Sequence, residues 1–123
     1  MLSKDLEETN MPFIDVKTNK QIDKDREIAL KQTLGKAIAI LPGKSEKWLM
    51  LDIHDGRCMY FHGDDAPCAM LQVQVFGKID PEKCEELTAE ICRIMYDVLQ
   101  IAPENTYVKY EEVSLWGWNS QNF

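Results

Sequence analysis

The residues of this chain with the clearest chemical potential are Met11 and Pro12, which open a short apolar run, Met-Pro-Phe-Ile-Asp-Val, over residues 11–16. A prolyl nitrogen without an acyl group is a secondary amine, and such an amine acts as a general base when its pKa lies near the working pH. While residues 1–11 remain attached, the same nitrogen is an amide whose lone pair is delocalised into the carbonyl group. The chemistry of Pro12 therefore depends on where the mature chain begins.

Pro12 also has a purely structural interpretation. Proline has no backbone N–H, so within sheets it is mostly confined to strand starts, edges and bulges. On that interpretation Pro12 is simply the first residue of a strand over residues 12–18. Residues 1–10 are polar and acidic and lack the apolar segment of a secretory signal. We expect residues 1–11 to be an extension that is disordered or absent from the mature chain, and residues 12–123 to form one domain.

The bulk composition restricts the partners of this domain. The net charge of −7 argues against nucleic acid or an anionic membrane as the main partner, and no apolar run approaches the roughly 20 residues that span a bilayer. The four cysteines form no Cys-x-x-Cys pair, so we expect reduced thiols and a cytoplasmic location, or release without a signal peptide. His54 and His62 share no metal-ligand spacing and are interpreted as loop residues. Neither a metal nor another cofactor is expected.

The first half of the chain predicts a strand, a helix and a hairpin after the Met-Pro pair. A helix over residues 23–41 is indicated by Asp23 as N-cap and by an apolar stripe at helical spacing; the stripe is Leu30, Leu34, Ala37, Ile38 and Leu41. Residues 47–53 are apolar on both faces, which favours a central strand covered on both sides. Asp55-Gly56 then predicts a hairpin turn into a short strand over residues 57–61.

The second half repeats the strand–helix–strand order. Residues 68–76 alternate between apolar and polar side chains, as a strand with two unlike faces does. A helix begins after Asp80 with Pro81 in its first turn and ends before Pro103, and strands follow at 107–113 and 115–118. The fold class is therefore α+β. Two pseudo-repeated βαβ units form a four-stranded mixed sheet with two helices on one face, and the leftover short strands favour burial against identical subunits.

Several short motifs, in order and at matching spacing, resemble the macrophage migration inhibitory factor family of the tautomerase superfamily. The resemblance runs from Pro12 to Phe123. The motifs are Met11-Pro12-Phe13-Ile14, Thr18-Asn19, Gly43-Lys44 before Trp48, Pro67-Cys68-Ala69, Phe76-Gly77-Lys78-Ile79, Tyr107-Val108-Lys109-Tyr110, Gly117-Trp118-Asn119 and Phe123. The resemblance implies a homotrimer in which short strands extend the neighbouring subunits' sheets, with active sites at the subunit interfaces.

The resemblance also implies keto–enol tautomerase activity on phenylpyruvate-like small anionic aromatic acids. Pro12 would then be the general base, and Lys44 would bind and polarise the substrate's carboxylate or carbonyl group. Phe76 would contribute backbone to the pocket, and Tyr107 would be supplied by the neighbouring subunit. Each of these residues also has a structural interpretation: Lys44 as a solvated charge, for example, and Tyr107 as interface packing.

Three departures from the family pattern stand out. Lys109 replaces an asparagine that contacts the far end of the substrate, and Trp116 replaces a smaller apolar residue on the pocket wall. The family's Cys-x-x-Cys motif has lost its second cysteine after Cys68. Lys109 and Trp116 thus remain candidate substrate-binding residues, with a surface charge and interface packing as their structural interpretations.

A second hypothesis belongs to another class of protein. If the extension before Pro12 is retained, its chain fills the mouth of the pocket and Pro12 is blocked. The protein would then be a catalytically inactive trimer that acts as a cytokine-like or protein-binding module, with a protein receptor as its partner. The intact mass of the mature chain separates the two hypotheses.

Overall fold

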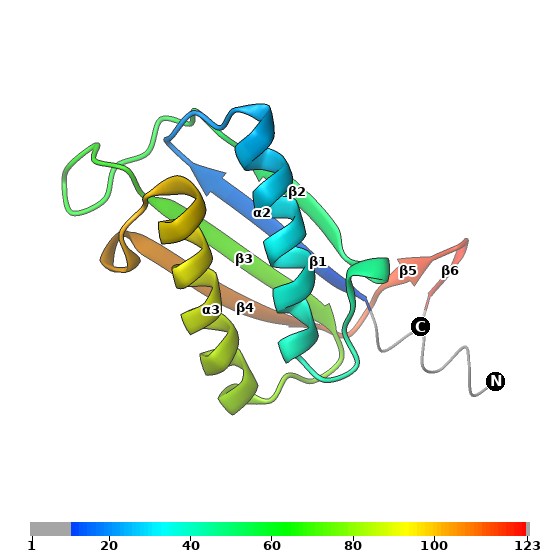
Figure 1. Ribbon diagram of the computed structural model, residues 1–123. Helices are drawn as coiled ribbons and strands as arrows, with labels where there is room; N and C mark the ends of the chain where they lie inside the picture. Colours follow the sequence, from blue (N-terminus) through cyan, green and yellow to red (C-terminus); the bar gives the residue numbers. More distant parts are fainter. Residues whose placement is uncertain (1–10, 123) are drawn as a thin grey trace.

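The computed structural model describes residues 11–122, which form a four-stranded sheet, two long helices and a small two-stranded sheet (Figure 1). The elements are β1 Pro12–Thr18, α2 Lys24–Ala37, β2 Met50–His54, β3 Ala69–Phe76, α3 Pro81–Leu99, β4 Thr106–Val113, β5 Gly117–Trp118 and β6 Gln121–Asn122. Short 3₁₀-helices, η1 Ile38–Ile40, η2 Glu46–Trp48 and η3 Pro103–Asn105, join them. The expectations for residues 1–10 and for Phe123 lie outside the described residues.

The sheet has the strand order β2-β1-β3-β4 and is built from two βαβ units, as the sequence predicts. β1 runs parallel to β2 across α2, and β3 runs parallel to β4 across α3. The two units join where β1 and β3 pair antiparallel, with Pro12 opposite Val75. Pro12 is the first residue of its strand, so its missing N–H disrupts no ladder inside the sheet.

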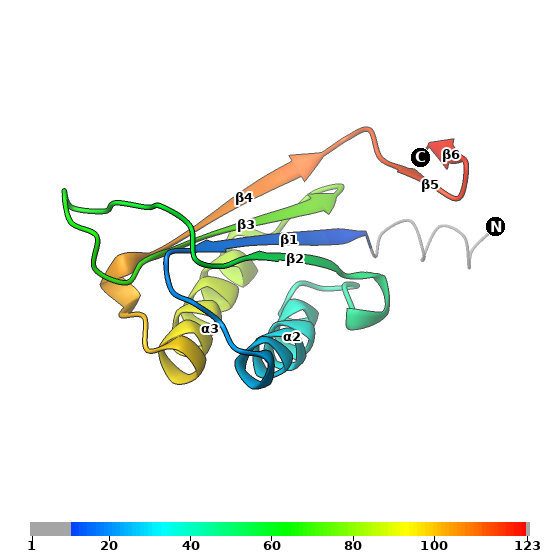
Figure 2. The same cartoon turned by 90° about the horizontal axis from the view of Figure 1, so that it is seen from above.

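Both helices cover the same face of the sheet, and Figure 2 shows them together on one side. Asp23 caps α2 by accepting a hydrogen bond from the Arg26 N–H, and Asp80 caps α3 by accepting one from the Glu82 N–H. The predicted stripe of α2 and η1 is fully buried, and it packs with α3 against the alternating buried residues of β3. The other face of the sheet, here called the open face, carries Gln72 and Gln74, which point away from this core.

Two predicted strands differ from the structure, and one strand was not predicted. β2 is an edge strand rather than a central one, and Met50 on it is 69% exposed. Residues 57–61 form no strand, because after β2 the chain returns to the end of β1: the Gly56 N–H donates to the Lys20 carbonyl, and the Arg57 N–H donates to the Thr18 carbonyl. The aromatic segment at 115–118 provides β5, which pairs with the unpredicted β6 as a hairpin.

The long loop after β2 is fixed to β1 by Asn19. Its side-chain amide donates to the carbonyl groups of Asp65 and Ala66, at 3.1 and 3.0 Å, and its oxygen accepts from the Cys68 N–H at 2.9 Å. One amide group thus satisfies backbone groups on both arms of the loop, which gives the Thr18-Asn19 motif a structural reason.

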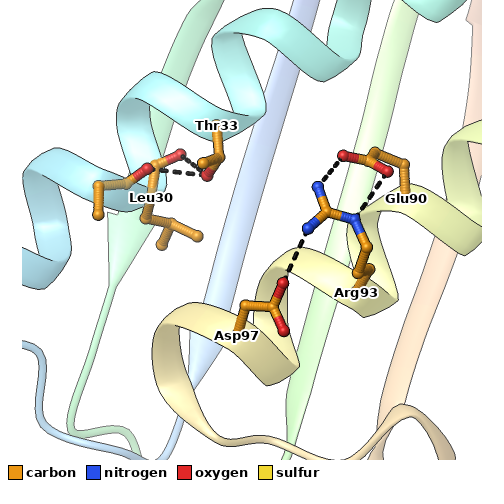
Figure 3. A network of polar contacts seen from close by, with 6 residues as sticks. Leu30, Thr33, Glu90, Arg93 and Asp97 are labelled. Carbon is orange, nitrogen blue, oxygen red and sulfur yellow. Dashed lines mark hydrogen bonds and ion pairs between the residues drawn. The ribbon is translucent and has the colours of Figure 1, made fainter.

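The solvent side of α3 carries a small ionic network (Figure 3). Arg93 pairs with Glu90 one turn earlier and donates to Asp97 one turn later, the latter at 2.8 Å. The hydrogen bond from Arg93 holds the pKa of Glu90 below its usual value. Such pairs add a few tenths of a kcal/mol each to a helix. On the facing helix, Thr33 donates to the carbonyl groups of Ala29 and Leu30.

None of the helices within residues 11–122 combines the length and the apolar character that a membrane crossing requires. The four cysteines, all within the same range, are free: Cys58 is exposed, Cys68 is buried, and Cys84 and Cys92 are half-buried.

Tyr110 ties β4 to α3 from the inner face of the sheet. Its hydroxyl donates to the Cys84 carbonyl at 2.9 Å and lies 2.8 Å from the Thr88 hydroxyl. Burial raises the pKa of Tyr110 to about 12. The phenol is therefore protonated in the folded protein at pH values where an unfolded tyrosine, with a pKa of about 10, already ionises.

Because the pKa of Tyr110 is higher in the folded state, the protonated phenol contributes fully to the free energy of unfolding below about pH 10. This contribution is lost as the pH rises towards 12. We predict that the free energy of unfolding of the unaltered chain falls over this interval by more than that of Tyr110→Phe, measured by urea unfolding at a series of pH values. Tyr96→Phe is the control, because Tyr96 is 57% exposed. Identical pH profiles for the unaltered chain and Tyr110→Phe would contradict the prediction.

Candidate functional site

The start of β1 opens onto a cavity of about 710 Å³. Its lining is Met11, Pro12, Phe13, Lys47, Trp48, Leu49, Met50, Gln74, Trp116, Gly117 and Trp118. These residues come from β1, from η2 and the start of β2, from β3, and from the segment that leads into β5. Figures 1 and 2 both place the β5–β6 hairpin beside the start of β1, so segments from the two halves of the described chain line one cavity.

Tryptophan dominates the wall of this cavity, because all three tryptophans of the chain line it. The rings of Trp48 and Trp118 pack edge to face, with centroids 5.0 Å apart and planes at 89°. The Lys47 ammonium lies 5.3 Å from the centroid of the Trp48 ring, within cation–π range. An apolar wall with one cation at its edge suits a flat molecule that carries a negative charge.

Pro12 lies in this wall as an acylated residue. Met11, which precedes it, is only 3% exposed, and its carbonyl oxygen accepts a hydrogen bond from the Phe76 N–H at 3.1 Å. The Pro12 nitrogen is therefore an amide in the described chain and has no basicity. Removal of Met11 would convert it into an amine at the same place and would release the Phe76 N–H.

Of the residues selected from the sequence, only Pro12 and Trp116 line this cavity. Lys44 follows the turn at Gly43, where its N–H donates to the Leu41 carbonyl, and half-burial of its side chain lowers the pKa of the ammonium group. Phe76 is the last residue of β3 and contributes backbone beside Met11. Neither Lys44 nor Phe76 is part of the cavity lining.

Tyr107 and Lys109 lie far from Pro12 within one chain. Tyr107 pairs with Met70 on β3, which in turn pairs with Lys17, near the opposite end of β1. Five residues along a strand correspond to roughly 17 Å. The Tyr107 side chain is 57% exposed and contacts the ring of Phe61, with centroids 4.7 Å apart. The described chain alone therefore does not bring the candidate residues into one site.

Sequence reasoning missed three residues of the cavity as functional candidates: Lys47, Trp48 and Trp118. The sequence places Trp48 and Trp118 in motifs without indicating a role for either, and it predicts Lys47 as the first residue of a strand. The adjacent pair Lys47-Trp48 directly after the Gly43-Lys44 turn was the available signal. This pair does not by itself indicate a site, because the sequence pattern predicts a strand from Lys47 onwards. In the structure Lys47 lies in η2, and this short helix brings it to the cavity.

The fold and the cavity define a class of protein: a βαβ repeat whose first strand presents a proline to an aromatic pocket. A family model described as macrophage migration inhibitory factor matches residues 11–122. The chain belongs to the macrophage migration inhibitory factor family.

Individual relatives agree with this assignment. The macrophage migration inhibitory factor of Meriones unguiculatus is 27% identical over 115 residues, which cover 92% of this chain and 99% of the relative. The homolog from Trichuris trichiura is 29% identical, over 92% of this chain and all of the relative. The crystal structure of Leishmania major MIF2 is similar with a TM-score of 0.86 and 28% identity, over 93% of this chain and 98% of that one.

We predict that Lys47 anchors negatively charged aromatic ligands in the cavity. Replacing Lys47 by alanine should weaken the binding of phenylpyruvate by about tenfold or more, because a charge-assisted hydrogen bond contributes about 1.5–3 kcal/mol. The quenching of tryptophan fluorescence measures this binding, since all three tryptophans report from the cavity wall.

Lys36→Ala serves as the control, because Lys36 is exposed in the last turn of α2 and away from the cavity. Equal affinities of Lys47→Ala and Lys36→Ala for phenylpyruvate would remove Lys47 from the binding site.

Proposed function

We propose that this protein is a keto–enol tautomerase of phenylpyruvate-like small acids, with the nitrogen of Pro12 as general base in a mature chain that begins there. The observation that carries the proposal is the position of Pro12 in the wall of a tryptophan-lined cavity that also holds Lys47. Membership of the macrophage migration inhibitory factor family supports it.

The proposed reaction moves one proton from the carbon beside a carbonyl group to the carbonyl oxygen, or back. A neutral prolyl amine accepts the proton from carbon, and the resulting ammonium returns it to the other atom. An ordinary α-amino group has a pKa of about 7.7–8.0. An apolar wall and nearby cations disfavour the protonated amine, and Lys47 supplies such a cation. Both effects favour the neutral base near neutral pH.

Lysine side chains also stabilise the negative charge that develops on the enolate oxygen. We assign this role to Lys44 together with Lys47. The half-burial that lowers the pKa of Lys44 is typical of functional lysines. On a chain with a net charge of −7, the lysine in the lining of this cavity favours a small anion locally.

We further propose that three copies of the chain assemble and complete each site across an interface, with Tyr107 and Lys109 supplied by a neighbouring copy. Several large apolar side chains are exposed on the single chain: Met50, Tyr60, Tyr107 and Leu115. The edge of β2 and the hairpin β5–β6 leave strand edges that a neighbour can cover. Four free thiols in such an assembly suit a reducing compartment, and we propose the cytoplasm as its location.

The alternative function is a non-catalytic binding module. Its supporting observation is the buried Met11, whose carbonyl group is hydrogen-bonded to Phe76 while Pro12 is acylated. A chain that keeps this bond lacks a base at Pro12, and its conserved fold would then serve recognition of another protein.

The two functions are separated by comparing the full chain with a version expressed from Met11. We predict that the shorter version loses its methionine, begins at Pro12 by intact mass, and tautomerises phenylpyruvate, whereas the full chain does not. Replacing Pro12 by glycine in the shorter version should lower kcat/KM by about 100-fold or more, since general base catalysis contributes about 10²–10⁴-fold. Undiminished turnover in the glycine variant would exclude Pro12 as the base.

The shared site is tested by subunit complementation. For the shorter version we predict a mass in solution three times that of its single chain, and separately purified Pro12→Gly and Tyr107→Ala variants of it that are each weakly active. When the two are unfolded together and refolded as a mixture, some interfaces combine an intact Pro12 with an intact Tyr107 and regain activity. A mixture no more active than its components would place Tyr107 outside the site.

A further inference from the structure

The open face of the sheet holds a second group of side chains with clear chemical potential, at the boundary between β1 and β2. Asp15 of β1 lies directly opposite Asp52 of β2 in the parallel register, and His54 of β2 lies opposite Lys17. The sequence analysis placed His54 in a loop, but it is the last residue of β2. Strand pairing therefore brings two carboxylates and an imidazole to one point.

The imidazole nitrogen joins both carboxylates. His54 Nε2 lies 3.0 Å from Asp15 Oδ1 and 3.0 Å from Asp52 Oδ2, and the three ligand atoms lie within 4.8 Å of one another. A single N–H bond points along one direction and cannot donate linearly to two oxygen atoms at once. Two carboxylate oxygens directed at one nitrogen also form an arrangement that a shared cation can occupy in place of the proton.

The distances suit a small divalent transition metal ion. Bonds of about 2.0–2.2 Å from zinc to nitrogen and to carboxylate oxygen, at tetrahedral angles, place neighbouring ligand atoms about 3.3 Å apart. The two contacts of His54 Nε2, at 3.0 Å, are close to that separation. The nitrogen–oxygen separations therefore need to change by only a few tenths of an ångström, and the two carboxylate oxygens already lie within 4.8 Å of each other.

The surroundings of Asp15 are those of a fixed ligand rather than of a solvated surface charge. Asp15 is 8% exposed although it lies on the open face. Lys17 pairs with its other oxygen, Oδ2, and so leaves Oδ1 directed at His54. Hydrogen bonds of this kind orient the carboxylates that bind metals. Like charges directly opposite one another on neighbouring strands are unfavourable, and Lys17 supplies one positive charge for the two carboxylates, so a further cation between Asp15 and Asp52 would be stabilising.

We propose that Asp15 Oδ1, Asp52 Oδ2 and His54 Nε2 bind a divalent transition metal ion such as Zn²⁺, with a fourth position open towards the open face. One imidazole with two carboxylates favours zinc-like ions over Mg²⁺, which takes oxygen ligands and keeps several waters. This site departs from the expectation that the chain binds no metal. It does not depend on the proposed tautomerase activity, since it uses none of the residues that line the cavity beside Pro12.

The test uses the full chain, freed of metal with a chelator, and titration with Zn²⁺ followed by calorimetry and thermal unfolding. We expect one Zn²⁺ per chain and a rise in Tm, because an ion that binds only the folded state stabilises it. The variants His54→Gln and Asp52→Asn should each lower the affinity for Zn²⁺ by at least about tenfold. Mg²⁺ at the same concentration should give no comparable rise in Tm.

His62→Gln is the matched control, because His62 is the other histidine of the chain and lies in a turn beside Phe61. It should keep the affinity of the unaltered chain. Since each variant is compared with and without Zn²⁺, a loss of stability in the metal-free protein does not obscure the result. The proposal is overturned if Zn²⁺ does not stabilise the unaltered chain, or if stabilisation persists in both His54→Gln and Asp52→Asn.

Discussion

The structure depends on one constraint on β1. This strand pairs along both of its edges, yet its first residue, Pro12, has no backbone N–H to donate. β1 runs parallel to β2 and antiparallel to β3, and it is the strand that joins the two βαβ units. Proline is acceptable only at the start of such a strand. Because Pro12 is placed there, its nitrogen lies at the end of the sheet, where η2 and the segment before β5 close around it. The pairing that organises the fold is therefore also the reason why a proline lines the cavity.

Most of the fold could be predicted because local patterns and tertiary structure agree. The alternation of β3 and the apolar stripes of α2 and α3 each bury the side that the pattern selects. The pattern failed at residues 48–51, where apolar residues on both faces suggested a central strand. Trp48 and Leu49 are apolar because they pack beside the cavity, and Met50 remains 69% exposed on an edge strand. A run of apolar residues indicates only that the side chains are buried against something, which can be the core, a ligand or another subunit. It therefore does not distinguish a central strand from an edge strand.

The candidate site could be predicted only in part for a related reason. Pro12 was recognisable because its chemistry follows from one residue and its position in the chain. Lys47 could not be selected from spacing, since its proximity to Pro12 arises from the turn at Gly43 and the short helix η2. The contact between His54 and Asp15 likewise requires the register of β2 against β1, which the sequence does not specify. Residues that act together across strands become visible only when the pairing is known.

The distribution of charge connects these two parts of the molecule. Asp15 and Asp52 gather negative charge on the open face, whereas the cavity next to Phe13 and Met50, two residues along the same strands, carries the cation of Lys47. Side chains two apart on a strand share a face and lie roughly 7 Å from each other. A chain with a net charge of −7 thus has a surface suited to cations and a cavity suited to anions at neighbouring residues of β1 and β2. Because the two groups of charges face neighbouring residues of β1 and β2, a ligand bound at either position adds its own charge to the field of this part of the sheet.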